Sequence, residues 1–367
     1  MQKTVAVFFG GRSNEREISV ITGMLAANLL REKVRVVPVY WGEDGVFYSS
    51  PEMRAVEDFR DFSPKRFPAV DLEGCALVCK KKRKKIVARL DCALNCCHGG
   101  MGEDGTLSAL LRFHGVPSAS PDAVVSGVFM DKSLGKIAAR GLGVPVADGV
   151  ALTESDWSDR DRAIEKAEAF GYPAIVKPAH LGSSIGIHVA KNRTELQEAL
   201  ELAFLLDRGA LVERYLAGKR DINCAACALG GKVVLSPCEE VFSQEEILSF
   251  SEKYEGGSAR ESALPADLPE PLAEEIRGYT RCIYENFGVR GVVRADFLVW
   301  EGKAYFNELN TVPGSLACYL FGESLTQSRD FLLALIEEAV PYGEKDVVES
   351  GILRKGFFSG GKSCKQR

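Results

Sequence analysis

The segment from Val292 to Gly314 constrains the fold more than any other part of the chain. It reads VVRADFLVW, then EGK, then AYFNELNTVPG, which predicts two strands joined by a short turn. If the three residues EGK form the turn, Asp296 lies opposite Glu308 and Arg294 lies opposite Asn310. Residues two apart in a strand share a face. The predicted hairpin therefore places four polar side chains on one face.

These four side chains have the chemistry of a metal and anion site. Carboxylate and amide oxygens on rigid strands suit Mg²⁺, which in such sites usually carries nucleotide phosphates. An arginine beside them can stabilise developing negative charge. The alternative is a surface hairpin whose polar face is only solvated. Two facing pairs followed by NTVPG favour the metal site.

Length and composition indicate an ordinary globular protein of two or three domains. The chain has 367 residues, of which 46% are hydrophobic and 26% charged. Its formal charge of −5 argues against general nucleic-acid binding. No apolar run reaches the length of a membrane helix. The start, MQKTVAVFFGGRS, predicts a first strand instead of a signal peptide, and we expect a cytoplasmic protein.

Eleven cysteines are present, and most lie in apolar, strand-like runs. Buried free thiols in a reducing compartment are the expected state. The cluster Cys96-Cys97-His98 and the pair Cys224 and Cys227 raise the alternative of a zinc site. Neither has a second half at ligand spacing, so we expect no metal–thiolate centre.

Strands and helices alternate over the first 120 residues, which predicts a parallel, doubly wound α/β sheet. Such sheets bind ligands beyond the carboxyl ends of their strands. Glu15 and His98 both follow predicted strands. Glu15 can complement a helix dipole or pair with a substrate ammonium. His98 can orient a substrate carboxyl group or bond to loop backbone. The later strands have a more antiparallel pattern.

A glycine-rich loop, Gly182-Ser183-Ser184-Ile185-Gly186, joins two predicted strands. Glycines at both ends allow backbone N–H groups to surround a phosphate, and a serine hydroxyl adds a donor. Lys177 ends the preceding strand and Lys132 lies in MDKSLGK, so both are candidate phosphate ligands. The alternatives are an ordinary hairpin loop and two solvated lysines.

The stretch Glu213-Arg214-Tyr215-Leu216 ends another strand. Backbone groups of such a linker commonly bind adenine, with a carboxylate on the ribose. Asp221 is the nearest later carboxylate. The alternative is an ordinary strand end.

Several segments together resemble one family. The segments GGRSNEREIS, HGGMGEDGT, MDK, IVKPAHLGSSIG, LVERYLAGKRD, SEKY, VRADF and NELNTVPG occur in the order found in D-alanine–D-alanine ligases of the ATP-grasp superfamily. The resemblance covers roughly residues 1–340. It implies an N-terminal doubly wound substrate domain (1–120) and a two-domain ATP-grasp fold (121–216 and 217–345). It also implies ATP and Mg²⁺ (or Mn²⁺) as cofactors, a homodimer, and a role in peptidoglycan synthesis. The polar composition of residues 346–367 predicts a disordered tail.

The resemblance also implies residue roles. Catalysis would involve Glu15, Ser183, Tyr254, Arg294 and Gly314. The amino-acid substrates would contact Glu15, His98, Lys253 and Ser315. ATP would contact Lys132, Lys177, Gly182, Ser183, Ser184, Glu213, Arg214, Tyr215, Leu216 and Asp221. Mg²⁺ would be held by Asp296, Glu308 and Asn310.

Two departures from the family pattern leave questions open. The family usually continues after Pro-Gly with Met-Thr and then a Ser-Leu pair, whereas this chain reads SLACYL from Ser315. The second substrate is therefore D-alanine or another acceptor such as D-serine. The stretch GKRD carries one extra residue, so either Arg220 or Asp221 takes the adenosine position. A catalytically silent ATP-binding protein is a third reading, which the retained Arg294 and metal ligands oppose.

Overall fold

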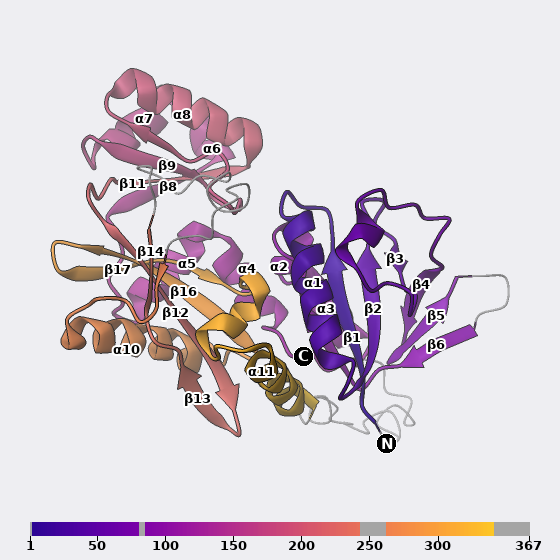
Figure 1. The fold of residues 1–367 in the computed structure, drawn as a ribbon. Coiled ribbons are helices and arrows are strands. Elements are labelled where there is room, and N and C mark those ends of the chain that lie inside the picture. Colours follow the sequence, from indigo (N-terminus) through magenta and orange to yellow (C-terminus); the bar gives the residue numbers. More distant parts are fainter. Residues whose placement is uncertain (1, 81–84, 243–261, 341–367) are drawn as a thin grey trace, which may run out of the picture.

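The computed structural model describes residues 2–80, 85–242 and 262–340 of the chain. Over these ranges it contains three sheets with helices packed on their faces (Figure 1). Lys253 and Tyr254, as well as the predicted polar tail, lie outside the described residues.

The first sheet has seven strands in the order β6-β5-β4-β3-β2-β1-β7. Its centre is parallel, since β1 pairs in parallel with β2 and with β7. The predicted parallel, doubly wound arrangement holds for this centre, and β3 to β6 extend the sheet with antiparallel pairing. The strands are β1 (Thr4–Gly10), β2 (Arg35–Trp41), β3 (Phe47–Tyr48), β4 (Ala69–Glu73), β5 (Ala76–Cys79), β6 (Lys85–Arg89) and β7 (Cys92–Asn95).

Strand β1 is buried on both faces, which explains its continuous apolar sequence TVAVFFG. Val5, Val7 and Phe9 pack in one hydrophobic cluster with helices α1 and α11, whereas Ala6 and Phe8 pack in another with α3. Helices therefore cover both faces of this sheet, as expected for a doubly wound arrangement. The helices of this region are α1 (Arg16–Leu30), α2 (Gly100–Glu103), α3 (Thr106–Phe113) and the 3₁₀ helix η1 (Val56–Phe59).

The second sheet is antiparallel, with the order β10-β9-β11-β8. Apolar side chains of α7 and α8 pack against it in a separate cluster. In Figure 1 these elements form the upper lobe. They are β8 (Gly149–Thr153), β9 (Ala174–Pro178), β10 (His188–Ala190), β11 (Gly209–Arg214), α6 (Glu154–Trp157), α7 (Arg160–Glu168) and α8 (Arg193–Leu206).

The third sheet has the order β15-β14-β12-β16-β17, with β13 paired to β12. One face packs against α4, α5 and α10, and α11 lies between β12 and the first sheet. The strands are β12 (Arg220–Leu229), β13 (Lys232–Leu235), β14 (Glu239–Val241), β15 (Ser262–Ala263), β16 (Val292–Trp300) and β17 (Lys303–Asn310). The helices are α4 (Ala123–Met130), α5 (Lys132–Gly141), α10 (Glu270–Asn286), α11 (Leu325–Ala339) and the 3₁₀ segment η2 (Gly314–Leu320).

The β16–β17 hairpin has the predicted register, with Asp296 opposite Glu308 and Arg294 opposite Asn310. The predicted three-residue turn is wrong, because Trp300 already pairs with Lys303 and leaves two residues in the turn. A β-bulge beside Asp296 compensates for the shorter turn. The two differences cancel, so the polar faces still meet as predicted.

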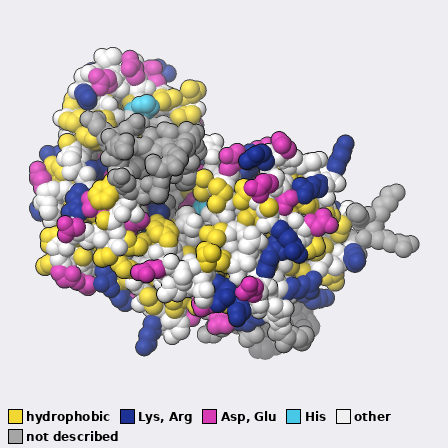
Figure 2. All heavy atoms as spheres, in the orientation of Figure 1, with side chains coloured by type: hydrophobic (Ala, Val, Ile, Leu, Met, Phe, Trp, Pro, Cys, Tyr) yellow, Lys and Arg dark blue, Asp and Glu magenta, His cyan; other side chains and the backbone are white. Residues whose placement is uncertain are grey.

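The described surface carries charges of both signs. On the face drawn in Figure 2, acidic and basic side chains are interspersed. Within the described ranges, no helix is long and apolar enough to cross a membrane. The ten described cysteines are free thiols, most of them buried, as predicted. The domain boundaries stay a prediction.

Candidate active site

One cavity of about 680 Å³ is lined by residues of the second and third sheets and by residues of α1, α2 and the His98 loop beside the first sheet. Every described candidate residue from the sequence lines it. These are Glu15, His98, Lys132, Lys177, Gly182, Ser183, Ser184, Glu213, Arg214, Tyr215, Leu216, Asp221, Arg294, Asp296, Glu308, Asn310, Gly314 and Ser315.

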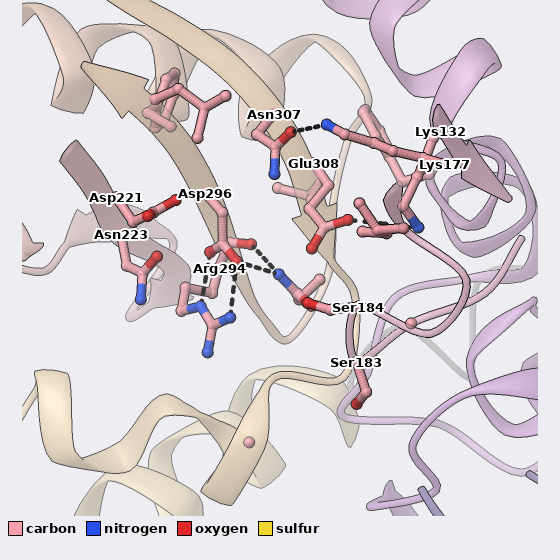
Figure 3. Close-up of a pocket in the computed structure, with 18 of the residues that line it drawn as sticks. Lys132, Lys177, Ser183, Ser184, Asp221, Asn223, Arg294, Asp296, Asn307 and Glu308 are labelled. Carbon is pink, nitrogen blue, oxygen red and sulfur yellow. Dashed lines mark hydrogen bonds and ion pairs between the residues drawn. The ribbon is translucent and has the colours of Figure 1, made fainter. Parts of the chain in front are cut away.

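The hairpin contributes the polar wall of the cavity. Arg294 forms two parallel hydrogen bonds to Asp296, of 2.7 and 2.8 Å. Asn310 Nδ2 donates to the same carboxylate at 3.0 Å. Figure 3 shows Arg294 and Asp296 paired beside Glu308. This pairing fixes the guanidinium in one orientation.

Arg294 keeps its charge in this buried place. Burial alone would lower its pKa, but the neighbouring Asp296 carboxylate raises that pKa above the usual value. A permanently charged donor is therefore directed at the cavity.

The opposite wall carries a buried charge network. Glu213, only 1% exposed, lies between two ammonium groups, with Lys136 and Lys177 each at 2.8 Å. Burial opposes ionisation of Glu213, yet the two lysines lower its pKa below the ordinary value. Lys177 also donates to Asn307 at 2.9 Å. Lys177 is thus held at the cavity wall, as Figure 3 shows.

Lys132 connects the loop wall to the hairpin wall. Its Nζ donates to the Leu181 carbonyl at 2.6 Å and lies 3.5 Å from a Glu308 oxygen. Its backbone N–H donates to Ala179. The two predicted phosphate lysines therefore both contact residues of β17 across the cavity.

The glycine-rich loop is in contact with Glu15. Ser183 Oγ donates to Glu15 Oε1. Ser183 and Ser184 have positive φ angles of 52° and 59°. A Cβ added to Gly182 would lie 2.8 Å from Glu15 Oε2, so the Glu15 carboxylate would have to shift to admit any other residue. The loop and the start of α1 thus form one wall.

His180, which the sequence reasoning did not select, anchors the base of this loop. Its ring lies 2.9 Å from Asp207 Oδ1 and 3.4 Å from Asp131 Oδ2. Hydrogen bonds to these two carboxylates raise the pKa of His180 to about 9. Asp131 is also the N-cap of α5, which begins at Lys132. The pairing ties the loop to this helix.

His98 lies in a chain of hydrogen bonds that crosses between the first and third sheets. Its Nδ1 donates to the Val312 carbonyl at 2.8 Å, so its Nε2 accepts from Thr22 Oγ1 at 2.8 Å. Thr22 Oγ1 in turn accepts from the Ser315 N–H at 3.3 Å. Burial lowers the pKa of His98, which favours the neutral ring.

Glu103, the last residue of α2, holds backbone on both sides of the cavity wall. Its carboxylate accepts the N–H groups of Gly99, Thr311 and Val312 at 3.0, 3.2 and 3.1 Å. Burial, together with the nearby Glu15, raises the pKa of Glu103 to about 7. Glu103 therefore fixes the segment that leads from β17 to Gly314.

The predicted adenosine end of the cavity favours Asp221 over Arg220. Asp221 lines the cavity and pairs with Lys219. Arg220 instead forms a two-bond ion pair with Glu240 and donates to the Asp267 carbonyl at 2.7 Å. Strand alternation therefore places Asp221 on the cavity face.

The donor atoms fit a magnesium ion. Asp296, Glu308 and Asn310 come from two adjacent strands and all line the cavity. Within the described part of the chain, no group of three His, Cys, Asp or Glu residues is placed to hold a metal. A metal here would thus depend on the Asn310 amide oxygen as its third ligand, and this all-oxygen set suits Mg²⁺. It does not suit zinc with thiolates.

Several lining residues escaped the sequence reasoning. Asn307 faces the cavity because the bulge breaks the strand's alternation, which sequence does not reveal. Asn223, Glu239 and Tyr319 also line the cavity. The alternation of β12 relative to Asp221 could have identified Asn223. Nothing local marked Glu239 or Tyr319.

The two antiparallel sheets that enclose the cavity, with a glycine-rich loop on one and carboxylates on the other, define the ATP-grasp fold of ATP-dependent ligases. Sequence models of the family match as well. The D-Ala–D-Ala ligase N-terminus matches residues 4–121 and the C-terminus matches residues 139–340. The chain belongs to the D-alanine–D-alanine ligase family.

Individual relatives agree with this assignment. The chain is 35% identical over 319 residues to a D-alanine–D-alanine ligase of Wolinella succinogenes, covering 86% of this chain and 89% of the relative. It is 33% identical over 321 residues to one of Helicobacter pylori strain J99, covering 87% and 90%.

Solved structures match over most of their length. The D-alanine–D-alanine ligase of Helicobacter pylori superposes with a TM-score of 0.77 at 30% identity, covering 92% of this chain and 98% of that one. The VanG D-Ala:D-Ser ligase of Enterococcus faecalis gives 0.77 at 25% identity, covering 92% and 100%.

Proposed function

We propose that this enzyme joins two D-alanines to D-alanyl-D-alanine, with ATP hydrolysed to ADP and phosphate through an acyl-phosphate intermediate. One observation carries the proposal. The candidate phosphate lysines contact the hairpin across one cavity, Lys132 at Glu308 and Lys177 at Asn307. Glu15 and Arg294 line the same cavity, so the residues proposed for phosphate, ammonium and oxyanion binding share it.

The first step converts a carboxylate, which is a poor electrophile, into an acyl phosphate. Transfer of the γ-phosphoryl group needs positioning and charge neutralisation more than a protein nucleophile. Lys132 and Lys177 neutralise phosphate charge, and the Gly182–Gly186 loop supplies backbone N–H donors. Glu15 binds the ammonium of the first D-alanine, oriented by its bond to Ser183.

In the second step the amine of the second D-alanine attacks the acyl carbon. The carbonyl oxygen becomes an oxyanion, which Arg294 and the backbone N–H of Gly314 stabilise. The pairing with Asp296 fixes Arg294 in place before the reaction, so little reorganisation is needed.

A magnesium ion fits Asp296, Glu308 and Asn310, and Mn²⁺ has the same oxygen preference. When bound, it supplies charge neutralisation at the nucleotide phosphates. The residues themselves contribute order to the site, because Asn310 donates to Asp296 and so keeps two of these side chains together.

The acceptor is the part of the proposal that the residues after Gly314 decide. Ser315, Leu316 and Ala317 all have positive φ angles, near 50°. The sequence SLACYL of this segment departs from the family pattern, so another acceptor such as D-serine is the alternative. The family relatives named above favour D-alanine.

The test is amino-acid-dependent phosphate release by the purified protein with ATP and Mg²⁺. D-Alanine should stimulate release strongly and L-alanine far less, with D-alanyl-D-alanine as the product. Equal or absent stimulation would reject the proposal. Mass spectrometry after mixing D-alanine with D-serine separates the two acceptors by product mass.

We also propose a cytoplasmic homodimer, which rests on the family resemblance alone. Light scattering of the purified protein should give twice the mass of the chain, 40.0 kDa. A monomer mass at micromolar concentration would contradict it.

A further inference from the structure

Glu239 stands in a row of polar side chains that crosses the third sheet. Strand pairing places Glu239 opposite Asn223, Asn223 opposite Asp296, and Asp296 opposite Glu308. All four line the cavity. The row thus extends the predicted metal site by two strands, and Figure 3 shows Asn223 beside Arg294 and Asp296.

The Glu239 carboxylate is buried, with 5% of the residue exposed, and is held from one side only. Asn223 Nδ2 and Tyr319 OH both donate to its Oε2, each at 3.1 Å. Among the described residues, Oε1 accepts no hydrogen bond and no lysine, arginine or histidine forms an ion pair with the carboxylate. These two donors therefore orient the carboxylate and leave one oxygen open.

The neighbouring Glu240 gives the contrast. It points to the other side of the strand, where Arg220 neutralises it with two hydrogen bonds. Arg294 lies near Glu239, but its guanidinium donates its two hydrogen bonds to Asp296. A buried carboxylate is costly unless it is fully paired, and among the described residues Glu239 shares the charge of Arg294 with Asp296 and forms no ion-pair contact of its own. This cost is relieved when a ligand brings a positive charge into the cavity.

We propose that Glu239 binds the α-ammonium group of the acceptor amino acid and makes the site prefer an amino acid over a hydroxy acid of the same shape. This inference rests on the ligase function proposed above. Glu15 serves the first substrate from the glycine-loop wall, and Glu239 serves the second from the opposite sheet. Arg294, on the same sheet face as Glu239, lies where the acyl oxyanion would develop.

In the ligation step Glu239 also accepts a proton from the acceptor ammonium group. The acceptor enters as an ammonium ion, and one of its protons passes to the Glu239 carboxylate and on to solvent. The neutral amine then attacks the acyl carbon, so the C–N bond forms and the C–O bond to phosphate breaks. The second proton leaves the amine with the phosphate. A hydroxy acid brings no positive charge, so it gains nothing from this carboxylate.

The matched variants are Glu239→Gln and Glu240→Gln, which make the same chemical change on adjacent residues that face opposite ways. Each is given ATP, Mg²⁺, D-alanine and D-lactate, and the dipeptide and the ester product are separated by mass. We expect E239Q to raise the acceptor concentration for half-maximal rate by about 10- to 100-fold, the value of a charged hydrogen bond. The product ratio should shift toward the ester by a similar factor. E240Q should match the wild type.

A second measurement distinguishes a loss of acceptor binding from a general loss of activity. Positional isotope exchange in ATP with D-alanine reports the first phosphoryl transfer, and E239Q should keep it. An unchanged acceptor dependence and product ratio in folded E239Q would overturn the inference. Loss of the isotope exchange in step with ligation would do so too, since Glu239 would then have a structural role.

If E239Q does not fold, Tyr319→Phe removes one of the two donors that orient Glu239. In this variant the product ratio should again shift toward the ester, by a smaller factor. An unchanged product ratio would reject the inference. Failure of the proposed function looks different. In that case the wild type itself forms no D-alanyl-D-alanine.

Discussion

The two sides of the cavity are built differently. The β16–β17 hairpin carries Arg294, Asp296, Glu308 and Asn310 on adjacent strands, where the hydrogen-bond ladder fixes them. The side formed by the start of α1, by α2 and by the Gly182–Gly186 loop consists of helix ends and loops, where Glu15, Ser183 and Glu103 are held by bonds between residues far apart in sequence. Strand-borne groups are rigid enough to carry charge chemistry, whereas loop-borne groups position the reactants. The predictions below test this division.

The largest effect is expected at the centre of the hairpin. Arg294→Ala should lower the ligation rate by about 10²- to 10³-fold, because an oxyanion donor is lost. It also leaves the Asp296 carboxylate without its cation. Phosphate release with D-alanine measures the loss. Arg281→Ala on the exposed face of α10 removes the same side chain and should be neutral. Activity within a few-fold of wild type in folded R294A would refute the role.

The next effect concerns the metal ligands. Glu308→Gln should lower activity by roughly 10²-fold at low Mg²⁺, since one anionic ligand is lost. More Mg²⁺ or Mn²⁺ should restore part of it. Titration of the rate against metal concentration measures the change. Glu301→Gln, at the exposed tip of the same hairpin, is the control. A Mg²⁺ dependence that E308Q leaves unaltered would remove Glu308 from the site.

On the loop side we expect a smaller effect on activity. Gly182→Ala places a Cβ 2.8 Å from Glu15 Oε2 and should disturb the Ser183–Glu15 bond. The rate at low substrate should fall by about 10-fold, the value of one positioned charged hydrogen bond. Gly141→Ala has no atom within 4 Å of the new Cβ and serves as the control. Equal rates for G182A and G141A would mean that the close approach is unimportant.

The smallest expected effect is on stability and depends on pH. The pKa of Glu103 rises from its ordinary value of 4.5 to about 7 in the folded protein. The folded state therefore binds a proton between these pH values that the unfolded state has released, so this group's contribution to stability falls as pH rises from 4.5 to 7. Above about 7 the contribution is constant.

The Glu103→Gln variant has no ionisable group at this position and lacks the pH-dependent contribution to stability. Urea unfolding at a series of pH values should show that wild type loses stability relative to E103Q across that window, by about 1 kcal/mol given solvent screening of a half-buried group. A difference that does not vary with pH would contradict the raised pKa.

The sequence predicted the hairpin side well because its information is local. Two-residue spacing gives the shared face, and the length of the hairpin gives the register of Asp296 and Glu308. The bulge at Asn307 could not be predicted, because it depends on a turn one residue shorter than expected. The alternation of strands and helices predicted the parallel centre of the first sheet, whereas the antiparallel pairing of β3 with β4 joins strands separated by a long connection and has no local signal.

The loop side was harder to predict because its bonds span long distances in the chain. The Glu103–Val312 bond joins residues 209 positions apart, and the His98–Val312 bond joins residues 214 apart. The sequence around each of these residues gives no signal of the distant partner. Glu239 became visible only when β14 was placed next to β12. The family resemblance supplied most of the candidate residues, and the structure added lining residues such as Asn223, Glu239 and Tyr319.

The most direct test of the account is the product that the wild-type enzyme makes from D-alanine, ATP and Mg²⁺. Mass spectrometry and nucleotide analysis should find one D-alanyl-D-alanine for each ADP and each phosphate. With D-alanine and D-serine at equal concentration, D-alanyl-D-alanine should dominate. Phosphate release without dipeptide, or a product that lacks two alanines, would contradict the claim that this cavity joins two D-alanines.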